Sequence, residues 1–264
     1  MAPPPTPPPT PPPTPPPTPP PTPPPTASPT PPPSEQLRSG TAEPMRSRWS
    51  PSSFDPAHDL GVVELDALLQ AARWAPSRGN SQPWVALVVR RGGPGHDGLA
   101  AALTRGNAWV RRASAVVVMC VRSGPDPAAD PGSKDARTPP VDYACYDTGQ
   151  AAAHLTLQAT ASGLHAHQFS GMDLDTVAAV LGVPDHFRPL AGIAVGRHLP
   201  PEGPGAEDVP EDGGPSAASL AEREARQRDR RGLGVAARDG AWDRPWTERT
   251  DRKEWAERAG GDGS

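Results

Sequence analysis

Cationic and polar side chains that could bind an anion lie near the start of the foldable part of the sequence. Arg48-Trp49-Ser50 places a guanidinium and a hydroxyl two positions apart, a pair suited to a phosphate or to the polar edge of a ring. A second segment, Pro76 to Trp84, joins the end of an amphipathic helix to a strand. It is rich in small and polar residues, namely Ser77, Arg78, Gly79, Asn80, Ser81 and Gln82. A polar loop between a helix and a strand is typical of a ligand-binding site.

Both segments also have a purely structural explanation. Ser50 before Pro51 fits the N-cap of a helix, although this leaves Arg48 unexplained. Pro, Ser, Gly and Asn are common turn residues, so they suit an ordinary loop between a helix and a strand. Turn composition does not explain why Gln82-Pro83-Trp84 follows.

A third pattern, Gly93-Pro94-Gly95-His96-Asp97-Gly98, matches the G-x-G-x-x-G motif of dinucleotide-binding folds. Three residues separate it from the preceding strand, and Pro94 removes an amide that could face a pyrophosphate. The next strand ends in Arg122 rather than in an acidic residue, although Arg122 could receive an NADP phosphate. A solvent-exposed turn is therefore favoured over a Rossmann site.

Histidine and cysteine residues give little support for a metal site. His165 and His167 are two apart on an expected strand and share one face, but no third ligand accompanies them at a suitable spacing. We expect no metal there. Cys120 and Cys145 are too few for a disulfide framework and are expected to be buried thiols.

Alternating helices and strands are expected between residues 60 and 200. An apolar stripe from Val63 to Ala72 predicts a helix that ends by Pro76, and a mobile loop is expected over 123–140. Further helices are predicted over Leu99–Thr104, Asp147–Ser162 with a glycine cap at Gly163, and Leu174–Leu181. Strands are predicted over Trp84–Val89, Ala115–Val121, His165–Phe169 and Ala191–Gly196. The order favours an α+β fold around a mixed sheet.

Composition divides the 264 residues into three parts. Residues 1–40 are mostly Pro-Pro-Pro-Thr repeats and are expected to be a disordered arm of polyproline II character. Residues 41–250 are long enough for one folded domain, and 251–264 are expected to be a flexible tail. A net charge of -4 argues against nonspecific nucleic-acid binding. No apolar run could cross a bilayer and no signal peptide is evident, so we expect no membrane association and a cytoplasmic location.

The two anion-binding segments, in this order and at this separation, resemble the opening of the FMN-dependent nitroreductase family. Two further segments extend the likeness, which covers about residues 44 to 245. Gly163 to Asp173 looks like the family segment that runs along the isoalloxazine ring, and Glu222 to Trp242 looks like the tail of one family branch. The resemblance implies a three-layer α+β fold with a mixed, mainly antiparallel sheet, and a homodimer with shared active sites.

The resemblance also implies a set of FMN-binding residues. Arg48 and Ser50 match residues that contact FMN, but the basic residue two places after that serine is Ser52 here. The loop that carries Gln82 matches one that reaches the FMN bound mainly to the other subunit. Arg228 and Arg230 match an Arg-x-Arg pair that, in one branch of the family, closes over the phosphate. The alternative interpretation of this charged run is a solvent-exposed helix with ion pairs along it. The full expected set is Arg48, Trp49, Ser50, Ser52, Pro76, Ser77, Arg78, Gly79, Asn80, Gln82, Asn107, Gln168, Phe169, Ser170, Gly171, Arg228 and Arg230.

The implied activity is transfer of hydride from NAD(P)H onto the flavin N5 atom and then to a nitroaromatic, a quinone or a similar electron-poor acceptor. A ping-pong cycle is expected, with no catalytic side chain, because the cofactor carries the chemistry. Ser170 and Gly171 are expected to offer a backbone N–H group to N5. Two alternatives stay open: a flavin-binding or sequestering protein without turnover, and an arm that serves a proline-binding module.

Overall fold

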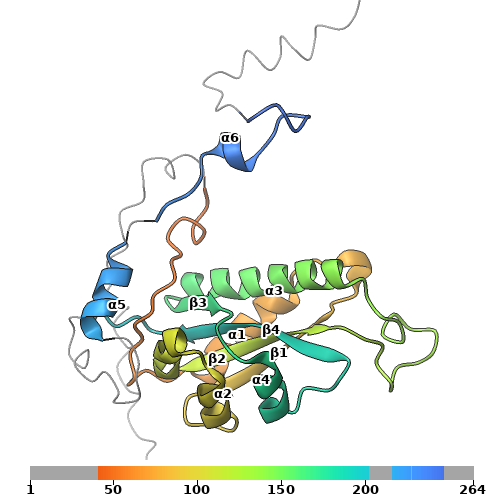
Figure 1. Ribbon diagram of the computed structural model, residues 1–264, viewed down its shortest axis with the longest axis horizontal. Coiled ribbons are helices and arrows are strands. Elements are labelled where there is room, and N and C mark those ends of the chain that lie inside the picture. The colour runs from red at the N-terminus through yellow and green to blue at the C-terminus, as the bar shows by residue number, and fades with distance from the viewer. Residues whose placement is uncertain (1–40, 202–215, 227, 247–264) are drawn as a thin grey trace, which may run out of the picture.

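A four-stranded sheet forms the middle layer of the protein in a computed structural model that describes residues 41–201, 216–226 and 228–246 (Figure 1). The strand order is β1-β2-β4-β3. The strands are β1 (Trp84–Arg90), β2 (Ala115–Arg122), β3 (His165–Phe169) and β4 (Phe187–Gly196). β2 has neighbours on both sides and is buried along its whole length, which explains its continuous apolar sequence.

Every strand pair in the described residues is antiparallel, so the expectation of a mixed sheet is wrong for this part of the chain. β2 and β3 do run in the same direction, because a helix crosses over between them. β4 lies between these two strands and is antiparallel to both. Two parallel strands therefore occur here only as strands that are not hydrogen-bonded to each other, and the expectation of a mainly antiparallel sheet agrees with the described strands.

Helices cover both faces of the sheet and make three layers. α1 (Val62–Arg73) and α3 (Val141–Ala161) pack on one face against side chains such as Val117. α2 (His96–Ala102), α4 (Leu174–Leu181) and the 3-10 helix η3 (Arg105–Arg112) pack on the other face. Figure 1 shows α3 on one side of the sheet and α2 with α4 on the opposite side. The α+β assignment is confirmed.

β3 and α4 have the boundaries that the sequence predicted, and the other elements differ mostly at their ends. α3 begins at Val141, six residues before the predicted start at Asp147. Asp147 lies inside that helix and is only 2% exposed, and its carboxylate accepts a hydrogen bond from the Arg78 N–H group. β4 begins at Phe187, before the predicted start, since its first residues continue the pairing with β2 past a bulge at Met119/Cys120.

The G-x-G-x-x-G segment is a turn followed by the first residues of α2, which starts three residues earlier than predicted. Gly95 has a φ of 79°. A Cβ atom at Gly98 would lie 2.3 Å from a side-chain carbon of Val180 on α4. Close packing between α2 and α4 thus explains Gly98 without a nucleotide.

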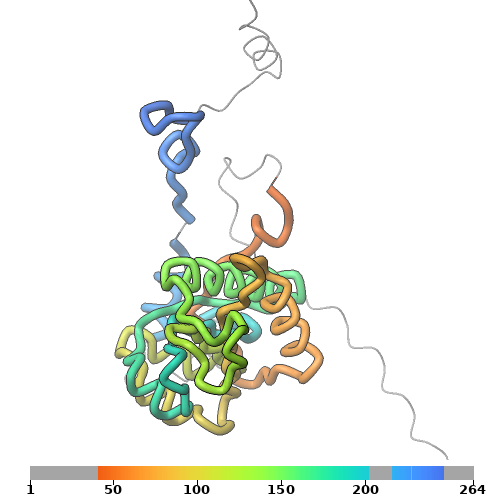
Figure 2. The backbone as a smooth tube through the Cα atoms, turned by 90° about the vertical axis from the view of Figure 1, so that its right-hand side faces the viewer, coloured from red at the N-terminus to blue at the C-terminus, as the bar shows by residue number. Residues whose placement is uncertain are grey.

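The C-terminal part of the described chain leaves the layered body after one docked helix. α5 (Ala217–Glu224) packs against the body through the buried Leu220. The short helix α6 (Leu233–Ala236) lies apart from the three layers in both views (Figures 1 and 2). The expected arm 1–40 and tail 251–264 lie outside the described residues.

Among the described residues, no helix is both long and apolar enough to span a membrane, and no group of three or more His, Cys, Asp and Glu residues could hold a metal ion. Both cysteines are free. Cys120 is buried, and this burial raises the pKa of its thiol to about 11, whereas Cys145 is only partly buried.

Candidate functional site

Arg48 and two arginines from a distant part of the sequence, Arg228 and Arg230, lie close together. The Arg48 Nη1 atom donates a hydrogen bond of 3.1 Å to Ser50 Oγ. Arg228 donates to the backbone carbonyl groups of Arg46 and Arg48, which are about 180 residues away in the chain. Burial, and then the nearby charges of Arg228 and Arg230, lower the pKa of Arg48. Burial and Arg230 do the same to the pKa of Arg228. We call Arg48, Ser50, Arg228 and Arg230 the arginine cluster.

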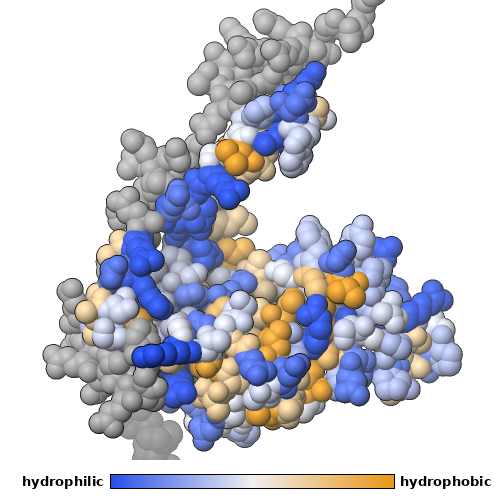
Figure 3. Space-filling model, viewed as in Figure 1, coloured by the Kyte–Doolittle hydropathy of each residue, from blue (hydrophilic) through white to orange (hydrophobic). Residues whose placement is uncertain are grey.

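The arginine cluster has the charge pattern of an anion site. Among the described residues, no carboxylate forms an ion pair with Arg48, Arg228 or Arg230. Three like charges in one place repel one another, so a bound anion would stabilise the arrangement. Figure 3 shows that strongly hydrophilic residues gather over α5 and the segment that follows it.

Glu224, at the end of α5, fastens the arginine-bearing segment to the body. One carboxylate oxygen accepts hydrogen bonds from the backbone N–H groups of Ser52 and Ser53, at 2.9 and 2.8 Å. The other oxygen lies 2.9 Å from His198 Nε2. The Glu224 side chain is 9% exposed, whereas the neighbouring ion pair of Arg226 with Glu222 is open to solvent. The charged run is thus more than a solvated helix, because one carboxylate of it is buried and bonded.

Ser52 does not face the arginine cluster as a replacement for the expected basic residue. It is 5% exposed, and its backbone is held by Glu224. Trp49 packs edge-on against His198 and His165, with ring centroids 4.9 and 5.8 Å apart. The site residue Trp49 is therefore part of the support beneath the cluster.

Two histidines on β3 line the same buried region, and burial lowers the pKa of both. Burial, and secondarily the charge of His198, lower the pKa of His165 to about 4. Burial also lowers the pKa of His167, whose Nδ1 atom lies 2.7 Å from the Pro51 carbonyl oxygen and whose ring stacks on Trp109 at 4.4 Å. The contacts with Pro51 and Trp109 fix the orientation of the His167 ring.

Asn107 and Gly171 form a second group. The Asn107 side-chain amide donates to the Gly171 carbonyl oxygen at 3.1 Å, and its own oxygen accepts a hydrogen bond from Trp109 Nε1 at 3.2 Å. Thr104 also donates to the Gly171 carbonyl, through both its N–H and its hydroxyl group. A Cβ atom at position 171 would lie 1.8 Å from Asn107 Nδ2, so this approach requires glycine.

The end of β3 and the two residues after it contain four residues of the expected FMN-binding set: Gln168, Phe169, Ser170 and Gly171. No hydrogen bond of the Ser170 or Gly171 N–H group occurs within the described part of the chain. Phe169 is 7% exposed and packs edge-on against Trp109. The Gln168 side chain points to the opposite face of the sheet, where it donates to Thr156 on α3 at 2.9 Å.

The loop from Pro76 to Gln82 folds as a short 3-10 turn, η2 (Arg78–Asn80), with an unusual backbone. Gly79, Asn80 and Gln82 have φ values of 58°, 54° and 44°. Positive φ angles are unfavourable for Asn and especially for Gln, and such strain is common at ligand sites. Ser77 Oγ accepts from the Gln82 N–H group, and the Pro76 carbonyl lies 3.5 Å from Gln150.

The loop and the arginine cluster do not meet within one chain. The loop contacts Asp147 and Gln150 on the first half of α3, and the residue 123–140 loop lies beside it. Figures 1 and 2 place that long loop and α5 on opposite sides of the molecule. A single chain therefore holds two separate halves of the expected site.

Comparison with known sequences decides the family. The family model of the Nitroreductase family matches residues 45–106 and 95–197. The chain belongs to the nitroreductase family. As a member, it is an oxidoreductase enzyme. An uncharacterised 15.4 kDa protein in the ask 5′ region of Mycolicibacterium smegmatis is 36% identical over 167 residues, which are 60% of this chain and 97% of that protein.

Solved structures also resemble this nitroreductase-family enzyme. One is described as an oxidoreductase containing FMN; it is 29% identical with a TM-score of 0.60, and the match covers 75% of this chain and 90% of that one. Another is a putative NAD(P)H:FMN oxidoreductase from Staphylococcus epidermidis, 21% identical with a TM-score of 0.50, with 63% and 92% of the two chains covered. The second likeness concerns the fold alone.

Several residues that hold the site of this nitroreductase-family enzyme escaped the sequence analysis. Glu224, His198, Trp109 and Thr104 all support predicted residues through direct contacts. Glu224 lies in a charged run that also contains Glu222 and Asp229, so the sequence did not distinguish it from its acidic neighbours. The others act through contacts between elements that no local pattern reveals.

Proposed function

We propose that this protein is an FMN-dependent oxidoreductase that takes hydride from NAD(P)H and passes it to a small electron-poor acceptor, such as a nitroaromatic or a quinone. The observation that carries the proposal is the arginine cluster, where three arginines lie close together and, in the part of the chain that the structure describes, none of them forms an ion pair with a carboxylate. A phosphate monoester fits this donor set, because guanidinium groups bind phosphate oxygens through charge-assisted hydrogen bonds. FMN carries such a phosphate.

Residues around Asn107 would hold the ring end of the cofactor. Asn107 is fixed by Trp109 and Gly171, and the backbone N–H groups of Ser170 and Gly171 are available as donors near it. When bound, FMN would supply hydride transfer through its N5 atom, and two substrates would use one site in turn in a ping-pong cycle. The residues of this chain would orient the ring, donate hydrogen bonds to it and exclude water.

We further propose that the active enzyme is a homodimer in which the Pro76–Gln82 loop completes the site of the partner. The separation of this loop from the arginine cluster in one chain supports the proposal. So do large apolar side chains that are exposed at the end of α1 and on α3: Trp74 (77%), Tyr146 (67%) and Val141 (46%). Side chains of this kind are enriched at subunit interfaces.

Residues 41–250 would form the catalytic domain, and the arm 1–40 would be an accessory segment of a cytoplasmic enzyme. Deletion of residues 1–40 is expected to leave flavin content and turnover unchanged. A loss of either would show that the arm takes part in the site.

An absorbance spectrum of the purified protein tests the cofactor. We expect flavin bands in the near ultraviolet and the blue, and release of FMN rather than FAD on denaturation. Arg48→Ala should weaken FMN binding by roughly 10- to 100-fold, the effect of losing one charge-assisted contact. Arg46→Ala is the matched control, because the side chain of Arg46 pairs with exposed Glu43 and only its carbonyl touches the cluster.

Steady-state oxidation of NADPH and NADH tests the reaction. We expect turnover that depends on added menadione or a nitroaromatic, with parallel double-reciprocal plots as a ping-pong cycle requires. A yellow protein without acceptor-dependent turnover would instead be a flavin-binding or sequestering protein. A colourless protein that cannot be reconstituted with FMN would refute the proposal.

A further inference from the structure

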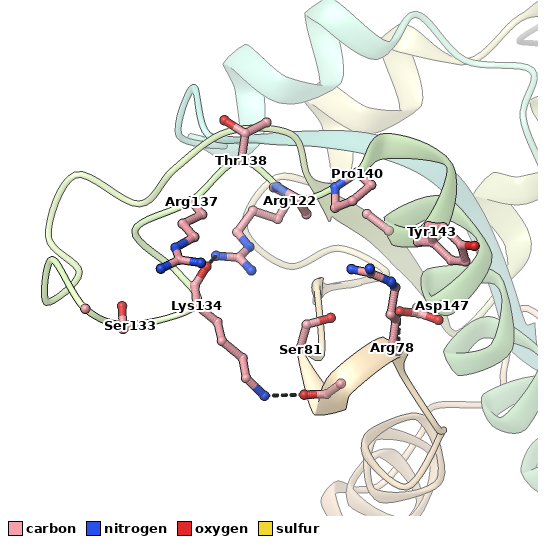
Figure 4. Close-up of a pocket in the computed structure, with 14 residues that line it drawn as sticks. Arg78, Ser81, Arg122, Ser133, Lys134, Arg137, Thr138, Pro140, Tyr143 and Asp147 are labelled. Carbon is pink, nitrogen blue, oxygen red and sulfur yellow. Dashed lines mark hydrogen bonds between the residues drawn. The ribbon is translucent and has the colours of Figure 1, made fainter.

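A second cationic site lies at the opposite end of the molecule from the arginine cluster. A pocket of about 350 Å³ opens between η2, the start of α3 and the residue 123–140 loop. Figure 4 shows Arg122, Lys134 and Arg137 entering the pocket from one side and Arg78, Tyr143 and Asp147 from the other. Its volume is at the lower end of the range for small-molecule sites.

The charges that line this pocket are strongly unbalanced. Four cationic side chains face one carboxylate, that of Asp147. This carboxylate is already engaged, because it accepts hydrogen bonds from the Arg78 N–H group at 2.9 Å and from Gln150 at 3.4 Å. The second carboxylate nearby, Asp135, is 59% exposed and pairs with Arg122 at 2.7 Å.

Contacts with the rest of the protein hold three of the four cationic side chains at the pocket. The Arg122 side chain is 4% exposed at the end of β2, so its charge is fixed at the pocket wall. The Arg78 guanidinium lies over the Tyr143 ring, 5.0 Å from its centre. Lys134 donates to the Gly79 carbonyl, which ties the long loop to η2. Its ammonium group keeps two further donors.

Arg137 supplies the donor that is still free. Within the described part of the chain, its guanidinium makes no hydrogen bond or ion pair, although it lines a pocket with three other cations. Like charges that line one pocket together attract an anion more strongly than a single charge does. The residue types also matter: planar guanidinium groups bind a tetrahedral phosphate through paired hydrogen bonds.

We propose that this pocket binds the 2′-phosphate of NADPH, so that the enzyme prefers NADPH to NADH. The inference rests on the proposed function, because NADPH is the reductant there. The pocket shares Arg78 and Gly79 with the loop that would complete the flavin site of the partner. A dinucleotide anchored here by its adenosine phosphate would therefore start beside the loop that borders the reaction site.

Kinetics with a loop variant test the proposal. Lys134→Gln/Arg137→Gln removes two pocket charges from exposed loop positions outside the proposed FMN site. We expect kcat/KM for NADPH to fall roughly tenfold or more, while kcat/KM for NADH changes less than about twofold. Lys134→Arg/Arg137→Lys should restore most of the preference, because it keeps both charges. Arg90→Gln, at the end of β1 and beside a different pocket, is the control and should change neither value.

A binding measurement separates this inference from the proposed function. Calorimetry with excess FMN present should show that the protein binds adenosine 2′-monophosphate at least about tenfold more tightly than adenosine, and that the double Gln variant loses the difference. If flavin and turnover are absent but this binding depends on Lys134 and Arg137, only the proposed function fails. Three results would each overturn the inference. The double Gln variant could lose kcat/KM equally with NADPH and NADH, or lose kcat/KM only for a carboxylated nitroaromatic acceptor. It could also still bind adenosine 2′-monophosphate more tightly than adenosine.

Discussion

At the scale of single residues, Gly171 shows how closely one position is constrained. Its carbonyl receives hydrogen bonds from Asn107 and Thr104, and its missing side chain leaves the space that Asn107 fills. The sequence indicated Gly171 only through its place in a family segment. The structure supplies a reason for the glycine that does not depend on a cofactor.

Gly171→Ala should therefore displace Asn107 and weaken the ring end of the site. We expect a loss of about 1–3 kcal/mol in the free energy of unfolding, since the partly buried Asn107 amide loses its partner and its space. Thermal unfolding and FMN titration measure the two effects. Gly106→Ala is the matched control, because a Cβ atom at Gly106 would meet nothing within 4 Å. Equal stability and FMN affinity of the two variants would contradict the assignment.

His165 makes stability depend on pH. Its pKa is about 4 in the folded protein and close to 6.5 when unfolded, so the unfolded chain binds more protons between these values. Stability from this residue is complete above about pH 6.5 and is lost as the pH falls towards 4. The expected loss between pH 7.5 and pH 5 is about 2 kcal/mol.

Urea unfolding at these two pH values measures the effect. His165→Gln should reduce the pH dependence by about that amount, whereas His154→Gln, on α3, serves as the control and should retain it. If the His165 variant keeps the full pH dependence, another group is responsible for it.

At the scale of elements, α5 is the least expected part of the site. Its sequence favours an exposed charged helix, and only one of its acidic residues, Glu224, is buried and bonded to the body. That contact keeps the following segment, with Arg228, beside Arg48.

Glu224→Ala should undock α5. Two backbone N–H groups and His198 would lose their acceptor, which costs about 2–4 kcal/mol when the losses are combined. Weaker FMN binding should accompany the loss of stability, and limited proteolysis should cleave near α5. Glu222→Ala, on the same helix but 78% exposed, should stay within about 0.5 kcal/mol of the parent protein. Similar behaviour of the two variants would contradict the anchoring role.

Element boundaries show where sequence patterns stop being sufficient. β3 and α4 were predicted to the residue, since apolar periodicity and flanking turn residues agree there. The start of α3 was predicted at Asp147, six residues too late. The actual role of Asp147, as a buried acceptor for Arg78 two turns into the helix, depends on a loop almost 70 residues earlier.

At the scale of the whole molecule, the proposed homodimer with shared sites predicts that two nearly inactive variants can restore activity to each other. Arg48→Ala damages one half of the proposed site, and Asn80→Ala/Gln82→Ala damages the other. Each homodimer should have little activity when FMN is present at a concentration that saturates only the parent protein. Hybrids formed by random coexpression should regain roughly a quarter of the parent activity, because half of the dimers would carry one intact site of two.

Activity of purified coexpressed mixtures, with light scattering to measure the mass, checks the prediction. A protein that is monomeric, or a mixture without any recovered activity, would place the whole site within one chain. The two variant proteins, expressed separately and mixed after folding, provide the control for exchange between subunits.

The sequence by itself determined the element types, the four segments that resemble the nitroreductase family, and most of the residues suited to an anion. These features are local, so periodicity and spacing are enough to reveal them. Only the tertiary structure decided that Arg228 lies against Arg48, that Glu224 holds Ser52 and Ser53, and that β4 separates β2 from β3. Such contacts join residues up to 180 positions apart. They depend on how buried faces and charges fit together after folding, which no window of sequence contains.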